Sequence, residues 1–148
     1  MFCLTVIVLI ICASLQSPAV SSEKQLIGAT AVVLIKEAGI SFDSRVDTGA
    51  GTTSINAQNI KQSNGTVVYT IVNQSGQQAR LSSKIIKQAV VKNAESSEKR
   101  MYVYLTLEYN GDIRTTLVNL NDRSNSSYKL LLGRNWLAGR YLVDVDKQ

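Results

Sequence analysis

Apolar and polar residues alternate along most of the chain with the short period of β-strands. Seven segments show this pattern or a short apolar run bounded by turn residues, which predicts strands. These are residues 31–35, 40–46, 66–72, 101–109, 113–120, 128–132 and 141–145. Only residues 134–138 are predicted to form a helical turn. The pattern therefore favours one all-β domain, either a small barrel or a sandwich.

Asn-Gly pairs mark the tightest predicted turns. Asn110 and Gly111 stand directly between two predicted strands, which is the strongest short signal for a β-hairpin. Asn64-Gly65 and Ser75-Gly76 flank the strand predicted at 66–72. We find no internal repeat and no linker, so the chain is read as a single domain after its first residues.

The first 22 residues carry no charge and contain an apolar run from Val6 to Ala13, followed by small residues. This pattern predicts a secretory signal peptide at 1–22, or an N-terminal anchor, followed by the domain at 23–148. The run is shorter than the roughly 20 apolar residues of a spanning helix. We expect an exported bacterial protein, periplasmic or secreted, with no stable membrane span after cleavage.

The composition excludes several kinds of chemistry. The chain has no histidine, and both cysteines, Cys3 and Cys12, fall in the predicted signal peptide. Ser-His-Asp and Cys-His catalysis and a zinc site of histidine or cysteine ligands are therefore excluded. We expect no cofactor and no metal.

The net charge of +5 belongs to residues 23–148, because the first 22 residues are uncharged. The cations are scattered and are not interleaved with aromatic residues, so nucleic acid is not an expected partner. The pattern is typical of a solvated basic surface. It would also attract acidic substrates or a polyanionic envelope surface.

One short motif suggests catalysis. Asp47-Thr48-Gly49 follows the strand predicted at 40–46 and is continued by the small residues Ala50 and Gly51. Alone, such a triplet is usually turn chemistry. A second element, Leu-Leu-Leu-Gly-Arg-Asn-Trp-Leu, stands some eighty residues later, at 130–137.

Together these two elements resemble those of the retropepsin-like aspartic proteases. The likeness is closer to a bacterial branch labelled "ATP-dependent zinc proteases", although the zinc label does not fit a chain without histidine. That branch commonly has arginine where this chain has Gly51. The resemblance implies an all-β, retropepsin-like acid-protease barrel with one short C-terminal helix.

The resemblance also implies roles for individual residues. Asp47 would be catalytic, paired with Asp47 of a second copy in a homodimer, and Thr48 would bond across the dimer axis. Gly49 and Ala50 would let the loop fold closely, and Leu132 and Gly133 would support it. Arg134 would form an ion pair or contact the substrate.

Two further assignments stay open at this stage. The segment 64–78, which carries Tyr69, is either a flap over the substrate or a plain surface hairpin. Asp144 or Asp146 could supply the second carboxylate of a monomeric site, whereas Asp112 is interpreted as a turn residue.

The implied function is an aspartic-type endopeptidase that hydrolyses a peptide or protein substrate by water activated between two Asp47 carboxylates. Acidic peptides are conceivable substrates, because the bacterial branch is associated with ligases that add glutamate. The alternative is an inactive domain of the same fold that binds a peptide or an envelope partner.

Overall fold

The computed structural model describes residues 23–92 and 97–147. The predicted signal peptide at 1–22 lies outside these residues. Within them, no helix is long and apolar enough to cross a membrane.

Eleven strands and one helical turn make up the described chain. They are β1 (Gln25–Ile27), β2 (Thr30–Ile35), β3 (Ile40–Val46), β4 (Thr53–Ser63), β5 (Thr66–Val72), β6 (Gln78–Lys84), β7 (Lys87–Lys92), β8 (Ser97–Tyr109), β9 (Asp112–Asn121), β10 (Leu130–Leu132), α1 (Arg134–Leu137) and β11 (Tyr141–Val143). The predicted all-β fold with one short C-terminal helix is confirmed. The predicted bounds hold for β3 and β5, whereas β1, β4, β6 and β7 were not predicted.

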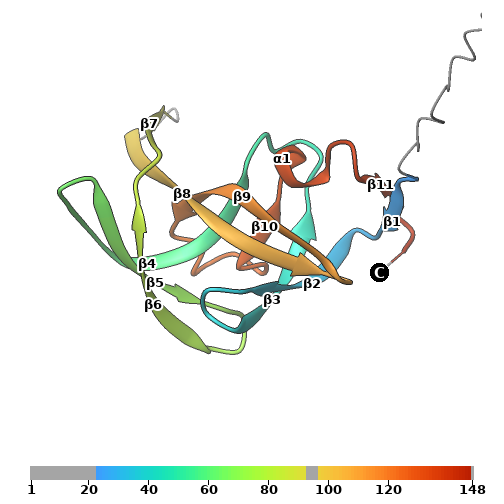
Figure 1. The fold of residues 1–148 in the computed structure, drawn as a ribbon, viewed down its shortest axis with the longest axis horizontal. Coiled ribbons are helices and arrows are strands. Elements are labelled where there is room, and N and C mark those ends of the chain that lie inside the picture. The colour runs from blue at the N-terminus through green and yellow to red at the C-terminus, as the bar shows by residue number, and fades with distance from the viewer. Residues whose placement is uncertain (1–22, 93–96, 148) are drawn as a thin grey trace, which may run out of the picture.

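Six strands close into a barrel. Their order is β10-β3-β2-β8-β9-β4, and β4 also pairs with β10, which joins the two ends of the sheet. The last part of β4 leaves the barrel and pairs with β5, which pairs in turn with β6. These three strands lie on the side of the molecule away from the C-terminus, while β1 and β11 pair beside that end of the chain (Figure 1).

The barrel core is apolar and follows the alternation read from the sequence. Phe42, Tyr69 and Trp136 are its largest fully buried side chains. Burial in β5 alternates strictly, with Val67, Tyr69 and Ile71 inside. One face of this strand is therefore packed on the core and the other faces outward.

Both Asn-Gly turns have the geometry that their sequence predicts. Asn110 and Gly111 have φ angles of 47° and 79°, and Asn64 and Gly65 have 48° and 74°. Positive φ at both central residues matches the twist of the flanking strands. The hairpin at Asn110-Gly111 is therefore confirmed, whereas Asn64-Gly65 joins β5 to β4, which was not predicted.

The segment 64–78 differs from its prediction. It is neither a flap nor a plain surface hairpin, because β5 runs through its middle and a turn lies at each end. Tyr69 is 0% exposed, and its hydroxyl lies 3.0 Å from that of Ser83. Its ring packs in the core, so it is not placed to cover a bound peptide.

Candidate active site

The loop that carries Asp47 begins where β3 ends, and the C-terminal part of the chain holds it there. β10 runs parallel to β3 with Leu132 beside Val46. The N–H of Asp47 donates to the carbonyl of Leu132 at 2.9 Å. The two sequence elements that suggested catalysis are thus brought together, although some eighty residues separate them.

The carboxylate of Asp47 is fixed by its own loop. Its Oδ1 atom accepts the N–H of Gly49 at 2.9 Å and that of Ala50 at 3.2 Å. A Cβ atom on Gly49 would lie only 3.1 Å from Oδ1, so glycine permits this close approach. One oxygen is therefore held by two main-chain donors, and the described residues make no hydrogen bond to the other.

Arg134 holds the same loop from the other side. Its Nη1 atom donates to the carbonyls of Thr48 and Gly49, both at 3.0 Å, and its N–H donates to the carbonyl of Ala50 at 2.8 Å. Among the described residues it forms no ion pair, which corrects the ion-pair assignment. Its guanidinium instead fixes the positions of Thr48 and Gly49.

Gly133 lies where no side chain fits. A Cβ atom there would stand 2.6 Å from the carbonyl carbon of Thr52 and 2.8 Å from the nitrogen of Thr53. Real Cβ atoms do not approach main-chain atoms so closely. Gly133 therefore lets the chain after β10 lie directly against the backbone of Thr52 and Thr53, while Leu132 supports the Asp47 loop through its carbonyl.

Asn135 is a contact point that sequence reasoning missed. Its Oδ1 atom accepts the N–H and the hydroxyl of Thr53 at 2.8 and 3.0 Å. Its Nδ2 atom donates to the Thr116 hydroxyl at 3.0 Å and to the Leu117 carbonyl at 2.7 Å. One side chain thus ties α1 to β4 and β9. Asn135 follows Gly-Arg in the C-terminal element, but its partners, far away in the sequence, give no local signal.

Asp47 and Thr48 line a cavity of about 730 Å³. Arg45 and Tyr128 line it as well, and neither was predicted. The remaining lining residues are Ala29, Thr30, Val46, Val143 and Val145. The cavity therefore combines a carboxylate and a cation with an apolar wall.

A second cation lies near the cavity. Arg123 donates from Nε to the carbonyl of Tyr128 at 3.2 Å. Burial and the nearby Arg100 guanidinium hold the pKa of Arg123 below its usual value, and the negative charge of Asp47 acts in the opposite direction. Arg123 is therefore a second cation beside the cavity, bonded to Tyr128 of its wall.

The candidates for a second carboxylate in the same chain are not brought to Asp47. Asp144 accepts the N–H of Asp146 at 3.1 Å, and neither residue lines the cavity. Asp112 is held elsewhere, by Arg114 at 3.0 Å and by the Tyr141 hydroxyl at 2.6 Å. Within the described part of one chain, no hydrogen bond links Asp47 to another carboxylate, and no three residues among His, Cys, Asp and Glu cluster as metal ligands would.

Comparison with known proteins places this geometry in a family. Residues 26–148 match the family model described as the RimB-like, retropepsin-like aspartic endopeptidase RimB. The chain is 28% identical over 133 residues to a probable alpha-L-glutamate ligase of Shewanella pealeana and 28% identical over 130 residues to one of Desulfotalea psychrophila. These matches cover 84% and 82% of this chain but only 29% and 28% of those proteins, so the chain spans less than a third of their length.

A solved structure shares the fold. The protein Lpg0085 of Legionella pneumophila, of unknown function (DUF785), has a TM-score of 0.72 and 24% identity. The match covers 84% of this chain and 95% of that one. The family match spans nearly the whole described chain and includes both elements of the Asp47 site. The chain belongs to the RimB-like family of retropepsin-like aspartic endopeptidases.

Proposed function

We propose that this protein is an aspartic-type endopeptidase that acts as a homodimer, with one Asp47 from each copy. The observation that carries the proposal is the Asp47 loop. One carboxylate oxygen is held by two amides, and the residue lines a cavity. Membership of a retropepsin-like family supports the same reading.

The chemistry requires two carboxylates. Two of them close together cannot both ionise cheaply, so they share one proton. The ionised member takes a proton from the attacking water, and the protonated member donates to the carbonyl oxygen and later to the leaving amine. Since no carboxylate of the described residues bonds to Asp47 within one chain, a second copy supplies it in this proposal. Thr48, exposed beside Asp47, bonds across the axis of this dimer.

A surface suited to that dimer lies next to the cavity. Leu26 of β1 and Leu142 of β11 are directly paired, and they are 55% and 53% exposed. Val145 is 75% exposed, and it lines the cavity together with Val143. Successive residues of a strand face opposite sides, so Leu26 and Leu142 form one exposed apolar pair while Val143 faces the cavity. Exposed apolar side chains of this kind favour association. The β1–β11 sheet is therefore the proposed dimer surface.

Acidic peptides are the proposed substrates. Arg45 lines the cavity at Asp47, and Arg123 lies close by, so a carboxylate side chain would meet opposite charge there. The names of the curated relatives, alpha-L-glutamate ligases, fit a context in which glutamate is added to another molecule.

Export of the protein is also proposed, and locating it in cell fractions tests this separately.

The second candidate is a non-catalytic domain that binds peptide or an envelope partner. One observation favours it, namely that Asp47 has no carboxylate partner within the described part of one chain. Incubation with a mixed peptide library, followed by mass spectrometry from mildly acid to neutral pH, separates the two. We expect Asp47→Asn to reduce cleavage roughly 100-fold or more, because it removes the group that handles the proton.

The control is Asp146→Asn, which removes an exposed carboxylate that does not line the cavity. It should cleave like the unmodified protein. Cleavage by neither the unmodified protein nor the control, at any pH, would refute the peptidase and support the binding domain. Cleavage that survives in Asp47→Asn would show that another group carries the reaction.

A further inference from the structure

A long central stretch of the chain has no acidic residue. Residues 53–92 contain five cations and neither aspartate nor glutamate. The cations are Lys61, Arg80, Lys84, Lys87 and Lys92. This stretch forms β4, β5, β6 and β7, so a whole region of the fold carries charge of one sign.

Three of these cations share one face. Lys61 is paired with Val68, Arg80 with Thr70 and Lys84 with Thr66. Directly paired residues project to the same side of a sheet. The even-numbered residues of β5 face away from the core, because Val67, Tyr69 and Ile71 face into it. We call the outward side of β4–β6, with Lys61, Arg80 and Lys84, the basic face.

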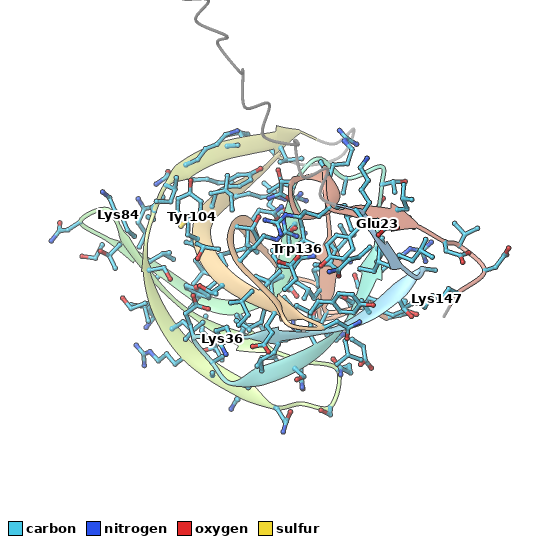
Figure 2. The ribbon with its side chains drawn as sticks, turned by 45° about the vertical axis from the view of Figure 1, so that its right-hand side comes forward. Glu23, Lys36, Lys84, Tyr104, Trp136 and Lys147 are labelled. Carbon is cyan, nitrogen blue, oxygen red and sulfur yellow. The ribbon has the colours of Figure 1, made fainter. Side chains whose placement is uncertain are left out.

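The basic face carries uncompensated charge. Among the described residues, none of its three cations forms an ion pair. Lys84 projects from the body of the protein into solvent (Figure 2). A hollow of about 230 Å³ lies between Lys61 and Arg80 and is also lined by Asn59 and Thr70. It is large enough to receive a side-chain carboxylate between two cations.

The strand that carries Arg80 and Lys84 is also the open edge of its sheet. β6 ends the strand order and is paired with β5 alone. The N–H of Asn73 donates to the main-chain carbonyl of Gln77 at 2.9 Å, and that of Ile85 donates to the carbonyl of Gly65 at 2.8 Å. Since bonding alternates along an antiparallel pair, the odd-numbered residues of β6 bond to β5. The peptide groups of Gln78, Arg80 and Ser82 therefore point to the open edge, whereas that of Lys84 points to the side on which β8 lies, since the N–H of Ile86 donates to the Tyr102 carbonyl at 2.8 Å.

We propose that the basic face and the open edge of β6 bind an extended acidic segment of another protein. The segment adds to the sheet as a strand next to β6, and alternate glutamate or aspartate side chains lie against Arg80 and Lys84 of that strand, while Lys61, two strands further in, adds to the positive potential of the face. Main-chain hydrogen bonds supply affinity and the cations supply selectivity, as in other complexes formed by strand addition.

The geometry favours a polypeptide over other polyanions. Only a polypeptide backbone matches the row of N–H and C=O groups along β6. The single aromatic residue of 53–92, Tyr69, is buried, so the face offers no ring on which a nucleic-acid base could stack.

Cations on an edge strand also have a protective effect. They keep an edge from pairing with another copy of itself, because like charges would face each other. That repulsion disfavours a second β6 but not an acidic strand, for which the same charges are attractive. The proposal concerns a face formed by β4–β6 and does not rest on the proposed function at Asp47.

Nuclear magnetic resonance of the labelled protein tests the proposal. The probe is an acetylated, amidated heptapeptide in which threonine and glutamate alternate. We expect its addition to shift the amide signals of Arg80 and Ser82 and to slow their hydrogen exchange. The double variant Arg80→Gln with Lys84→Gln should weaken binding about tenfold, since exposed charge pairs contribute up to about 1 kcal/mol each. Lys147→Gln, at an exposed lysine of the C-terminal tail, is the matched control and should bind normally.

Four further probes decide the mechanism. A peptide with lysine in place of glutamate should not bind, and one methylated on alternate main-chain nitrogens should bind much more weakly. Equal binding of the methylated peptide would overturn strand addition. Tighter binding of single-stranded DNA or of phosphatidylserine vesicles at the same salt concentration would overturn the choice of a polypeptide partner. Unchanged binding in the double variant would overturn the role of the basic face.

Discussion

The close contact at Gly133 gives the sharpest test of the site's architecture. In Gly133→Ala, the new methyl carbon would lie 2.6 Å from the Thr52 carbonyl carbon and 2.8 Å from the Thr53 nitrogen. Favourable contacts between carbon atoms lie near 3.5–4.0 Å, so the backbone must move by about 1 Å. The φ angle of Gly133 is −90°, which alanine adopts readily, so the effect comes from the contact alone.

We expect Gly133→Ala to lower the free energy of unfolding by about 1–3 kcal/mol, as overpacking of a close contact does. The single tryptophan, Trp136, is buried three residues away, and its fluorescence during urea unfolding reports the change directly. Gly51→Ala is the matched control, because the nearest atom to its Cβ would be Nη2 of Arg134 at 3.7 Å. That variant should stay within about 0.5 kcal/mol of the unmodified protein. Equal midpoints for both variants would refute the close approach of β10 to the loop before β4.

Three further changes test other parts of the molecule. Asn135→Ala leaves the buried N–H of Thr53 without its acceptor and should cost about 1–3 kcal/mol, measured by the same urea unfolding. Burial and, to a smaller extent, the hydrogen bond to Asp112 and its negative charge raise the pKa of the Tyr141 hydroxyl from 10.0 to about 12. The unfolded chain therefore loses this proton first, and stability should fall as pH rises from about 10 to 12. Tyr141→Phe should lack that part of the decline, which unfolding at stepped pH would show. Leu142→Asp places a charge on the proposed dimer surface and should yield a monomer in analytical ultracentrifugation, whereas an unchanged dimer would exclude that surface.

The sequence identified β3 and β5, in which apolar and polar residues alternate. β5 alternates between buried and half-exposed positions, and its bounds were predicted correctly. β4 was missed because its environment changes along its length. Its first five residues, Thr53–Ala57, are all buried, and the residues from Asn59 onward are all exposed. Neither half shows the period of two that identifies a strand.

The sequence predicted the part of the site whose contacts join residues close together in the chain. The carboxylate of Asp47 makes its hydrogen bonds within three residues, so this part of the site is visible as a motif in the sequence. The roles of Arg134 and Asn135 depend on partners more than eighty residues away, which only the closed barrel brings near. Tyr69 was misread because glycine-bounded strands are typical both of flaps and of core strands, and burial alone separates the two.

The conformation of the Asp47 loop depends on contacts within one chain, whereas the proposed activity depends on a second copy. The two can therefore be tested separately. Leu132 and Arg134 hold the loop, and β1 and β11 contribute none of these bonds. A monomeric Leu142→Asp protein should therefore keep the N–H groups of Gly49 and Ala50 bonded to Asp47, seen as slow hydrogen exchange, while it loses peptide cleavage. Slow exchange with lost cleavage would be the expected result if water is activated between two copies of Asp47. A strictly monomeric variant has no second copy of Asp47, and no carboxylate of the described residues bonds to Asp47 within one chain. Full cleavage by such a variant would therefore refute the pairing.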